Sequence, residues 1–115
     1  MLVYVASPYS SVPDKHQLMR TVAQTCGKYM LAYPGQYAVS GLIHHYALSE
    51  VEGLGTDYEF WKNWCETFLR KCEKLVVLTI PGWNTSTGVA AEIQLAKSLN
   101  MPIEFIDPTS FYNIA

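Results

Sequence analysis

The chain has 115 residues, half of them hydrophobic, and a formal net charge of -2. This length suits one domain with a single core, and the apolar content excludes a disordered chain. The near-neutral charge argues against a nucleic-acid polymer or a membrane surface as a partner, and it favours a small molecule.

The cysteines and the hydropathy pattern together favour a location inside the cell. The three cysteines contain no Cys-x-x-Cys pair, so we expect free thiols rather than a disulfide framework or a structural zinc site. No apolar run approaches the roughly 20 residues that span a bilayer, and the N-terminal apolar run is too short for a signal peptide. We therefore expect a cytoplasmic protein.

Predicted strands and helices alternate along the chain. The apolar run at 2–6 is typical of a strand buried on both faces, and helical spacing after Pro13 predicts a helix to about residue 32. The later elements, in order, are a short strand at 37–39, an ambiguous stretch at 41–48 that fits a loop with a helical turn, a Gly-rich loop at 53–56, a helix over 57–71, a strand at 75–80, a helix over 87–99, a strand at 103–106 and an apolar tail. This order predicts one α/β domain, an open parallel sheet with helices on both faces.

Ligands of such folds bind beyond the carboxyl ends of the strands. Two predicted loops occupy that position, one at 7–11 and one at 81–88. We therefore expect the functional site between these two loops.

Glu92 is the most unusual residue of the helix predicted over 87–99. It falls inside the apolar arc that contains Val89 and Ala96, where an unpaired charge is costly to bury. Its side chain leans toward the helix N-terminus, over Gly88, which leaves open space. Ser86 is the expected N-cap and precedes free backbone N–H groups that favour an anion.

A recessed carboxylate of this kind suits nucleophilic attack on C1′ of a sugar, because the transition state is oxocarbenium-like and positively charged. The alternative is a structural carboxylate that is paired with a buried cation. The two interpretations differ in whether Glu92 faces an open cleft.

Two segments resemble the nucleoside 2-deoxyribosyltransferase superfamily. Tyr4-Val5-Ala6-Ser7-Pro8-Tyr9 is similar to its first strand and loop, and Gly82-Trp83-Asn84-x-Ser86-x-Gly88-Val89-x-x-Glu92-x-x-x-Ala96 is similar to its catalytic helix. The Ser-x-Gly-x-x-x-Glu spacing resembles the branch that hydrolyses 2′-deoxynucleoside 5′-monophosphates. The Gly-Trp-x-x-Ser-x-Gly form also resembles small phage and bacterial members.

The resemblance implies a flavodoxin-like or Rossmann-like sheet of four to five strands, with no metal or organic cofactor. It implies that Glu92 is the nucleophile that cleaves the N-glycosidic bond of a (deoxy)nucleoside or its 5′-monophosphate. Transfer of deoxyribose between bases and non-catalytic nucleotide binding are the alternatives. The resemblance also implies a homodimer or larger homo-oligomer, with Thr109, Ser110 and Asn113 as candidate donors to a partner's site.

The resemblance further implies a second carboxylate on the preceding helix, for which Glu66 is the first candidate and Asp57 and Glu59 are rivals. The residues expected to contact the substrate are Tyr4, Ser7, Pro8, Tyr9, His44, Trp83, Ser86 and Gly88. Trp83 either stacks on a base or packs in the core.

The chain departs from the monophosphate hydrolases in one respect. They carry a basic residue in the loop after the first strand, where this chain has Tyr9-Ser10-Ser11. His16, Arg20 and His44 are candidates for the missing charge. The His44-His45 pair has no third ligand at metal spacing, so we predict no metal site there.

Overall fold

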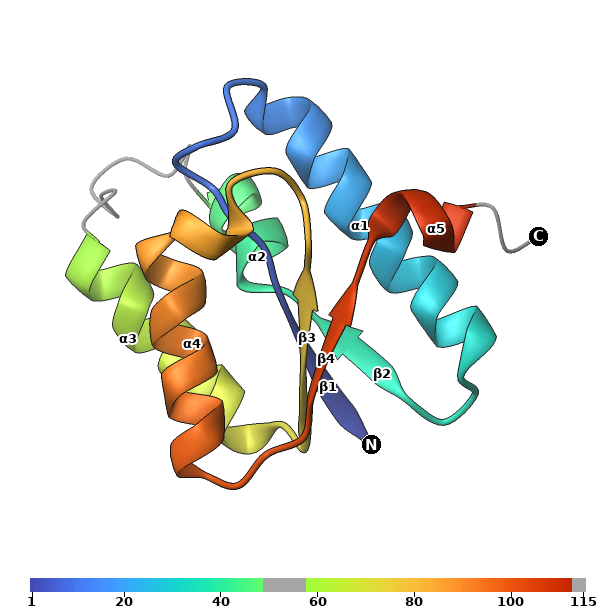
Figure 1. Cartoon of the computed structure of the whole chain (residues 1–115), viewed down its shortest axis with the longest axis vertical. Helices are drawn as coiled ribbons and strands as arrows, with labels where there is room; N and C mark the ends of the chain where they lie inside the picture. The colour runs from blue at the N-terminus through green and yellow to red at the C-terminus, as the bar shows by residue number, and fades with distance from the viewer. Residues whose placement is uncertain (49–57, 113–115) are drawn as a thin grey trace.

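A computed structural model describes residues 1–48 and 58–112, and all structural statements below concern these residues. Its centre is one parallel sheet with the strand order β2-β1-β3-β4 (Figure 1). The strands are β1 (Leu2–Ala6), β2 (Tyr37–Val39), β3 (Lys74–Leu78) and β4 (Ile103–Ile106). In the central pair Val3 lies beside Lys74 and Ala6 beside Val77, so β1 and β3 end at the same edge of the sheet.

Helices cover both faces of the sheet. Helices α1 (Lys15–Ala32) and α5 (Pro108–Tyr112) lie on one side, whereas α3 (Tyr58–Lys71) and α4 (Thr87–Ser98) lie on the other (Figure 1). Helix α2 (Gly41–Leu48) contacts α1, α3 and β1. A short 3₁₀ helix, η1 (Trp83–Thr85), leads into α4.

The alternation of side chains along the central strands builds two cores. Val3 and Val5 of β1 pack in the core under α1, whereas Tyr4 and Ala6 pack in the core under α3 and α4. Successive residues of a strand point to opposite faces, so one continuous apolar run supplies both layers. Tyr4 is therefore buried on the α3–α4 face.

Two local features shape the upper loops. Asp14 caps α1 by accepting a hydrogen bond from the Gln17 backbone N–H. Gly82 has a φ of +97°, and a Cβ atom there would collide with the side chain of Ser11. A glycine is required at this position because the loop after β1 and the loop after β3 touch there.

The predicted fold class is confirmed: the chain is an α/β domain with a four-stranded, all-parallel sheet. The predicted strand at 103–106 and the predicted helix limits near 32 and 71 agree with the structure. The predicted strand at 75–80 is too long, since β3 ends at Leu78. The ambiguous stretch is a full helix, α2, and the apolar tail begins with α5, which its pattern did not predict. The loop predicted at 53–56 lies outside the described residues.

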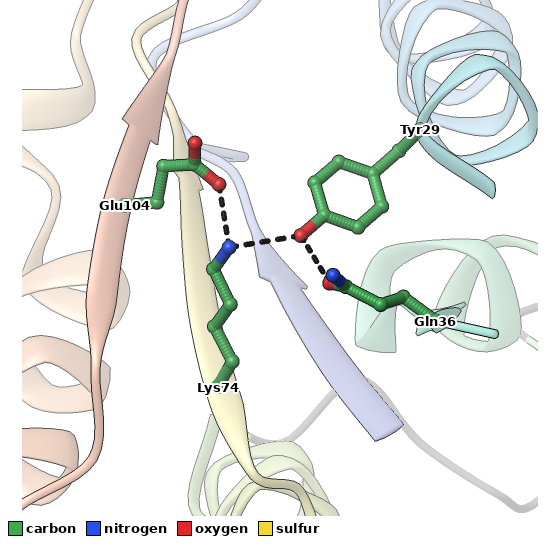
Figure 2. Close-up of polar contacts among 4 residues, drawn as sticks. All are labelled: Tyr29, Gln36, Lys74 and Glu104. Atoms are coloured by element: carbon green, nitrogen blue, oxygen red, sulfur yellow. Dashed lines mark hydrogen bonds and ion pairs between the residues drawn. The ribbon is translucent and has the colours of Figure 1, made fainter. Parts of the chain in front are cut away.

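A polar network closes the sheet at the amino ends of its strands, opposite the predicted site. Lys74 forms an ion pair with Glu104 at 2.8 Å and donates a hydrogen bond to the Tyr29 hydroxyl at 3.0 Å, and Tyr29 donates to Gln36 Oε1 at 2.7 Å (Figure 2). Burial alone would lower the pKa of Lys74, but the bonds to Glu104 and Tyr29 outweigh it and raise that pKa, so the ammonium stays charged. The network joins α1, β3 and β4.

We expect Lys74→Met to lower the free energy of unfolding by about 1–2 kcal/mol, because it leaves Glu104 and the Tyr29 hydroxyl without their shared donor. Urea unfolding measures the change. Lys71→Met is the matched control, since Lys71 is exposed on α3. Equal stabilities of the two variants would contradict the assignment.

Candidate functional site

A cavity of about 630 Å³ opens at the carboxyl ends of β1 and β3. It lies between the loop after β1, the start of α4, and the facing sides of α2 and α3, which is where parallel α/β sheets bind ligands. Its lining residues are Tyr4, Val5, Ala6, Ser7, Tyr9, Ser10, Ser11, Gly41, Leu42, His45, Trp61, Lys62, Cys65, Glu66, Thr85, Ser86, Thr87, Gly88, Ala91 and Glu92.

Glu92 contributes a recessed carboxylate to this cavity. The residue is partly exposed, but its Oε2 atom is buried and has no hydrogen-bond partner among residues 1–48 and 58–112. Unpartnered buried carboxylate oxygens are rare because desolvation is costly. The interpretation of Glu92 as one half of a structural ion pair finds no support among residues 1–48 and 58–112, because the ion pair found there joins Lys74 to Glu104 and not a cation to Glu92.

Burial, Tyr4 and Glu66 set the protonation state of Glu92. Burial raises the pKa of Glu92 to about 7, hydrogen bonding to Tyr4 opposes this, and the charge of Glu66 adds to it. Burial and the nearby Glu92 charge in turn raise the Tyr4 pKa well above its usual value, so Tyr4 remains a phenol that can donate. Glu92 and Glu66 therefore line one cavity, and the charge of Glu66 acts on Glu92 across it.

The floor of the cavity is closely packed around Gly41. A Cβ atom at this position would lie 2.7 Å from Cys65 Sγ and 2.8 Å from the Tyr4 hydroxyl oxygen. Burial raises the pKa of the Cys65 thiol to about 11, so this sulfur is a neutral packing atom and not a nucleophile. The first residue of α2 thus fixes the space around the hydroxyl that bonds Glu92.

We expect Gly41→Ala to lower the free energy of unfolding by about 1–3 kcal/mol, because the added methyl group overpacks the floor. Gly27→Ala is the matched control: nothing lies within 4 Å of its Cβ position in α1, and alanine should stabilise that helix by about 0.5–1 kcal/mol. Thermal and urea unfolding give both values. Stabilisation by Gly41→Ala would show that the floor is not closed.

The rim of the cavity is rich in hydroxyl groups. Ser86 caps α4 by accepting a hydrogen bond from the Val89 backbone N–H at 3.3 Å. The Cβ position of Gly88 meets only Ser86 Oγ, at 3.9 Å, so the first turn of α4 leaves open space. Ser7 Oγ is buried without a hydrogen-bond partner in the described part of the chain.

Aromatic rings line another part of the cavity. The His45 ring lies between those of Tyr9 and Trp61, with centroid distances of 5.1 Å and 4.5 Å. His45 Nε2 is also buried and lacks a hydrogen-bond partner within 1–48 and 58–112. Three buried unpartnered polar atoms, those of Ser7, His45 and Glu92, thus belong to residues of one cavity.

The structure brings most of the predicted site residues together. The residues that line the cavity as predicted are Tyr4, Ser7, Tyr9, Glu66, Ser86, Gly88 and Glu92. Pro8 is buried beside the cavity and does not line it. Asp57 and Asn113 lie outside the described residues.

Other predicted site residues lie elsewhere. His44 packs against Trp64 and Phe68, with centroid distances of 5.3 Å and 6.4 Å. Trp83 packs against the core under α3 and α4 and contacts the exposed ring of Phe105, so of its two interpretations the geometry favours packing. Glu59, His16, Arg20, Thr109 and Ser110 do not line the cavity either.

Sequence reasoning missed Gly41, His45, Trp61, Lys62 and Cys65, all of which line the cavity. The helical character of 41–48 was ambiguous, so the sequence could not decide which of the adjacent histidines turns inward. Lys62 and Glu66 are four residues apart on α3 and therefore share a helix face, which is the signal that could have found Lys62. Lys62 is a cationic residue of the cavity lining, whereas the loop at 7–11 contains no cation.

Within 1–48 and 58–112, three or more His, Cys, Asp or Glu side chains nowhere gather as a metal site requires. In the same ranges, no helix has the length and apolar character needed to cross a membrane.

Comparison with known proteins places the chain in a family. No curated protein matches it. The family described as "Domain of unknown function (DUF1937)" matches residues 1–107, which include every strand of the sheet and every residue that lines the cavity. The chain belongs to this DUF1937 family.

Proposed function

We propose that the protein cleaves the N-glycosidic bond of a (deoxy)nucleoside or its 5′-monophosphate through a covalent glycosyl-Glu92 intermediate. The observation that carries the proposal is Oε2 of Glu92, which is buried in the cavity beyond β1 and β3 and has no hydrogen-bond partner among residues 1–48 and 58–112. Glu92 begins the second turn of α4, a rigid element that can hold a nucleophile in one orientation.

The reaction needs two steps, and the two carboxylates fit the two roles. In the first, a Glu92 carboxylate oxygen bonds to C1′ while the C1′–N bond breaks, and the electron pair of that bond leaves with the base, which takes a proton from solvent. In the second, water attacks C1′, gives its proton to the Glu66 carboxylate, and releases Glu92 as a carboxylate. The products are the free base and the free sugar, or the sugar 5-phosphate when the substrate is a 5′-monophosphate.

The electrostatics support this assignment of roles. An ionised Glu92 is costly in its buried position, as its raised pKa of about 7 indicates. Positive charge develops at C1′ in the transition state, and it offsets that cost at the moment of reaction. The Tyr4 hydrogen bond favours the ionised form and orients it.

The rim supports a sugar or sugar phosphate as the polar part of the substrate. Ser7, Ser86 and Thr87 contribute hydroxyl groups to the lining of the cavity, and Lys62 contributes a positive charge. Hydroxyl groups and free N–H groups at a helix start suit sugar hydroxyls or a phosphate. Soluble nucleotide substrates and three free cysteines support a cytoplasmic location.

Chromatography of the products tests the proposal. The native protein is incubated with deoxynucleosides, ribonucleosides and their 5′-monophosphates, with and without a second free base. We expect release of free base from at least one substrate. Exchange of base that requires the second base would identify a transferase that uses the same intermediate. No release and no exchange with any substrate would refute the proposed activity.

A further inference from the structure

We propose that Tyr9, His45 and Trp61 form the wall that binds the base of the substrate, and that His45 Nε2 hydrogen-bonds a polar atom on the edge of that base. This inference rests on the proposed function, and it names the part of the cavity that selects the substrate. The three residues are distinct from the nucleophile, Glu92, and from the serine and threonine residues of the rim.

The geometry of the three rings favours a flat aromatic ligand. His45 is tilted by 58° to Tyr9 and by 48° to Trp61, so the three rings form an angled surface rather than a closed stack. Trp61 is 7% exposed and anchors one end, whereas Tyr9 is 36% exposed and lies at the opening. Aromatic surfaces bind bases by stacking, and they do so for any base.

The wall is held from outside the cavity by Lys15. Its ammonium group donates to the backbone carbonyls of Tyr9 and Val12, and it lies 4.4 Å from the centroid of the Tyr9 ring. These contacts fix both the backbone and the ring of Tyr9 before any ligand arrives. The wall is therefore preorganised.

His45 gives the wall its polar atom. Nε2 is buried and unpartnered within the described ranges, whereas a buried polar atom normally finds a partner. Burial lowers the pKa of His45, so the imidazole is neutral near pH 7 and can pair with an uncharged group. A nucleobase supplies both a flat face and a polar edge of this kind.

His44 offers a matched control. It is the neighbouring residue of the same helix, yet its ring packs against Trp64 and Phe68 and does not line the cavity. His44→Phe and His45→Phe make the same chemical change on two sides of α2. His45→Gln is a third variant, which removes the ring but keeps a polar atom near the position of Nε2.

Calorimetric titration with free adenine, guanine, cytosine and thymine tests the inference without any turnover. We expect the native protein and His44→Phe to bind at least one base equally well. His45→Phe should bind that base about tenfold to a hundredfold more weakly, since a buried hydrogen bond is lost. His45→Gln should bind more tightly than His45→Phe, and thermal unfolding would show that each variant is folded.

The outcomes separate this inference from the proposed function. Native-like base binding by His45→Phe, an equal loss in His44→Phe, or no binding of any base to the native protein would overturn it. Base binding that depends on His45, in a protein that releases no base from any nucleoside, would support the wall while the glycosidase proposal fails. Base release that is unchanged in His45→Phe would overturn the wall alone.

Discussion

Glu92→Gln is expected to abolish base release and, at the same time, to stabilise the folded protein at pH 8. Burial raises the pKa of Glu92 to about 7 from an ordinary value of 4.5. At about 1.4 kcal/mol per pH unit, the gap corresponds to about 3 kcal/mol of stability that the native protein loses when Glu92 ionises. Glutamine has a similar shape and carries no charge to desolvate, so it avoids this loss.

The sign of the effect depends on which state holds the proton more tightly. The folded state does, because its Glu92 pKa is the higher one. The contribution of Glu92 to stability is therefore largest below about pH 4.5, falls as the pH rises to about 7, and is constant above that value. Native protein and Glu92→Gln should be closest in stability at acidic pH and furthest apart at about pH 8.

Urea unfolding at about pH 5 and about pH 8 measures this difference. Gln94→Ala is the control, because Gln94 is an exposed residue of the same helix, does not line the cavity and carries no titratable group. It should leave the pH dependence of stability unchanged. A Glu92→Gln protein that is less stable than the native protein at pH 8 would mean that the Glu92 carboxylate is satisfied in the fold, which the account excludes.

Tyr4→Phe and Glu66→Gln should move the acidic limb of the pH–activity profile in opposite directions. Cleavage requires ionised Glu92, so kcat/KM should rise with pH and level off above the Glu92 pKa of about 7. The Tyr4 hydrogen bond lowers this pKa, and losing it moves the limb to higher pH. The Glu66 charge raises the pKa, and losing it moves the limb to lower pH.

The profile is measured as kcat/KM from about pH 5 to about pH 9. Glu66→Gln should also slow turnover by roughly 10²- to 10⁴-fold, since it removes the proposed general base that takes a proton from the attacking water. The position of the limb and the height of the plateau report different roles and are read independently. Shifts in the same direction in both variants would contradict the opposed effects of Tyr4 and Glu66 on Glu92.

The sequence predicted those parts of the site that depend on local pattern. Glu92 stands out because a helix wheel places it on an apolar arc, and Ser86 and Gly88 follow from the rules of helix starts. The run at 2–6 identifies β1, and therefore the loop beyond it. These features are encoded within a few residues of one another.

The parts that the sequence did not predict depend on how distant elements pack. Whether the side chain of His44 or of His45 faces the cavity depends on how α2 packs against α1, β1 and α3. Gly41 is informative only once Tyr4 and Cys65 are known to meet beside it. Contacts between elements that are distant in the sequence leave no pattern among neighbouring residues, so a single sequence does not reveal them.

The measurement that tests the covalent glycosyl-Glu92 intermediate most directly is the mass of the peptide that contains Glu92, taken during turnover. The substrate is an analogue, with fluorine at C2′, of a nucleoside or nucleotide from which the protein releases the base. The fluorine withdraws electrons from C1′ and so slows breakdown of the intermediate. The analogue is mixed with the native protein, the reaction is quenched in acid, and the protein is digested into peptides. We expect the peptide containing Glu92 to gain the mass of the sugar, and the corresponding peptide of Glu92→Gln to gain nothing. A sugar attached to another residue, or base release by Glu92→Gln at the native rate, would contradict the covalent glycosyl-Glu92 intermediate.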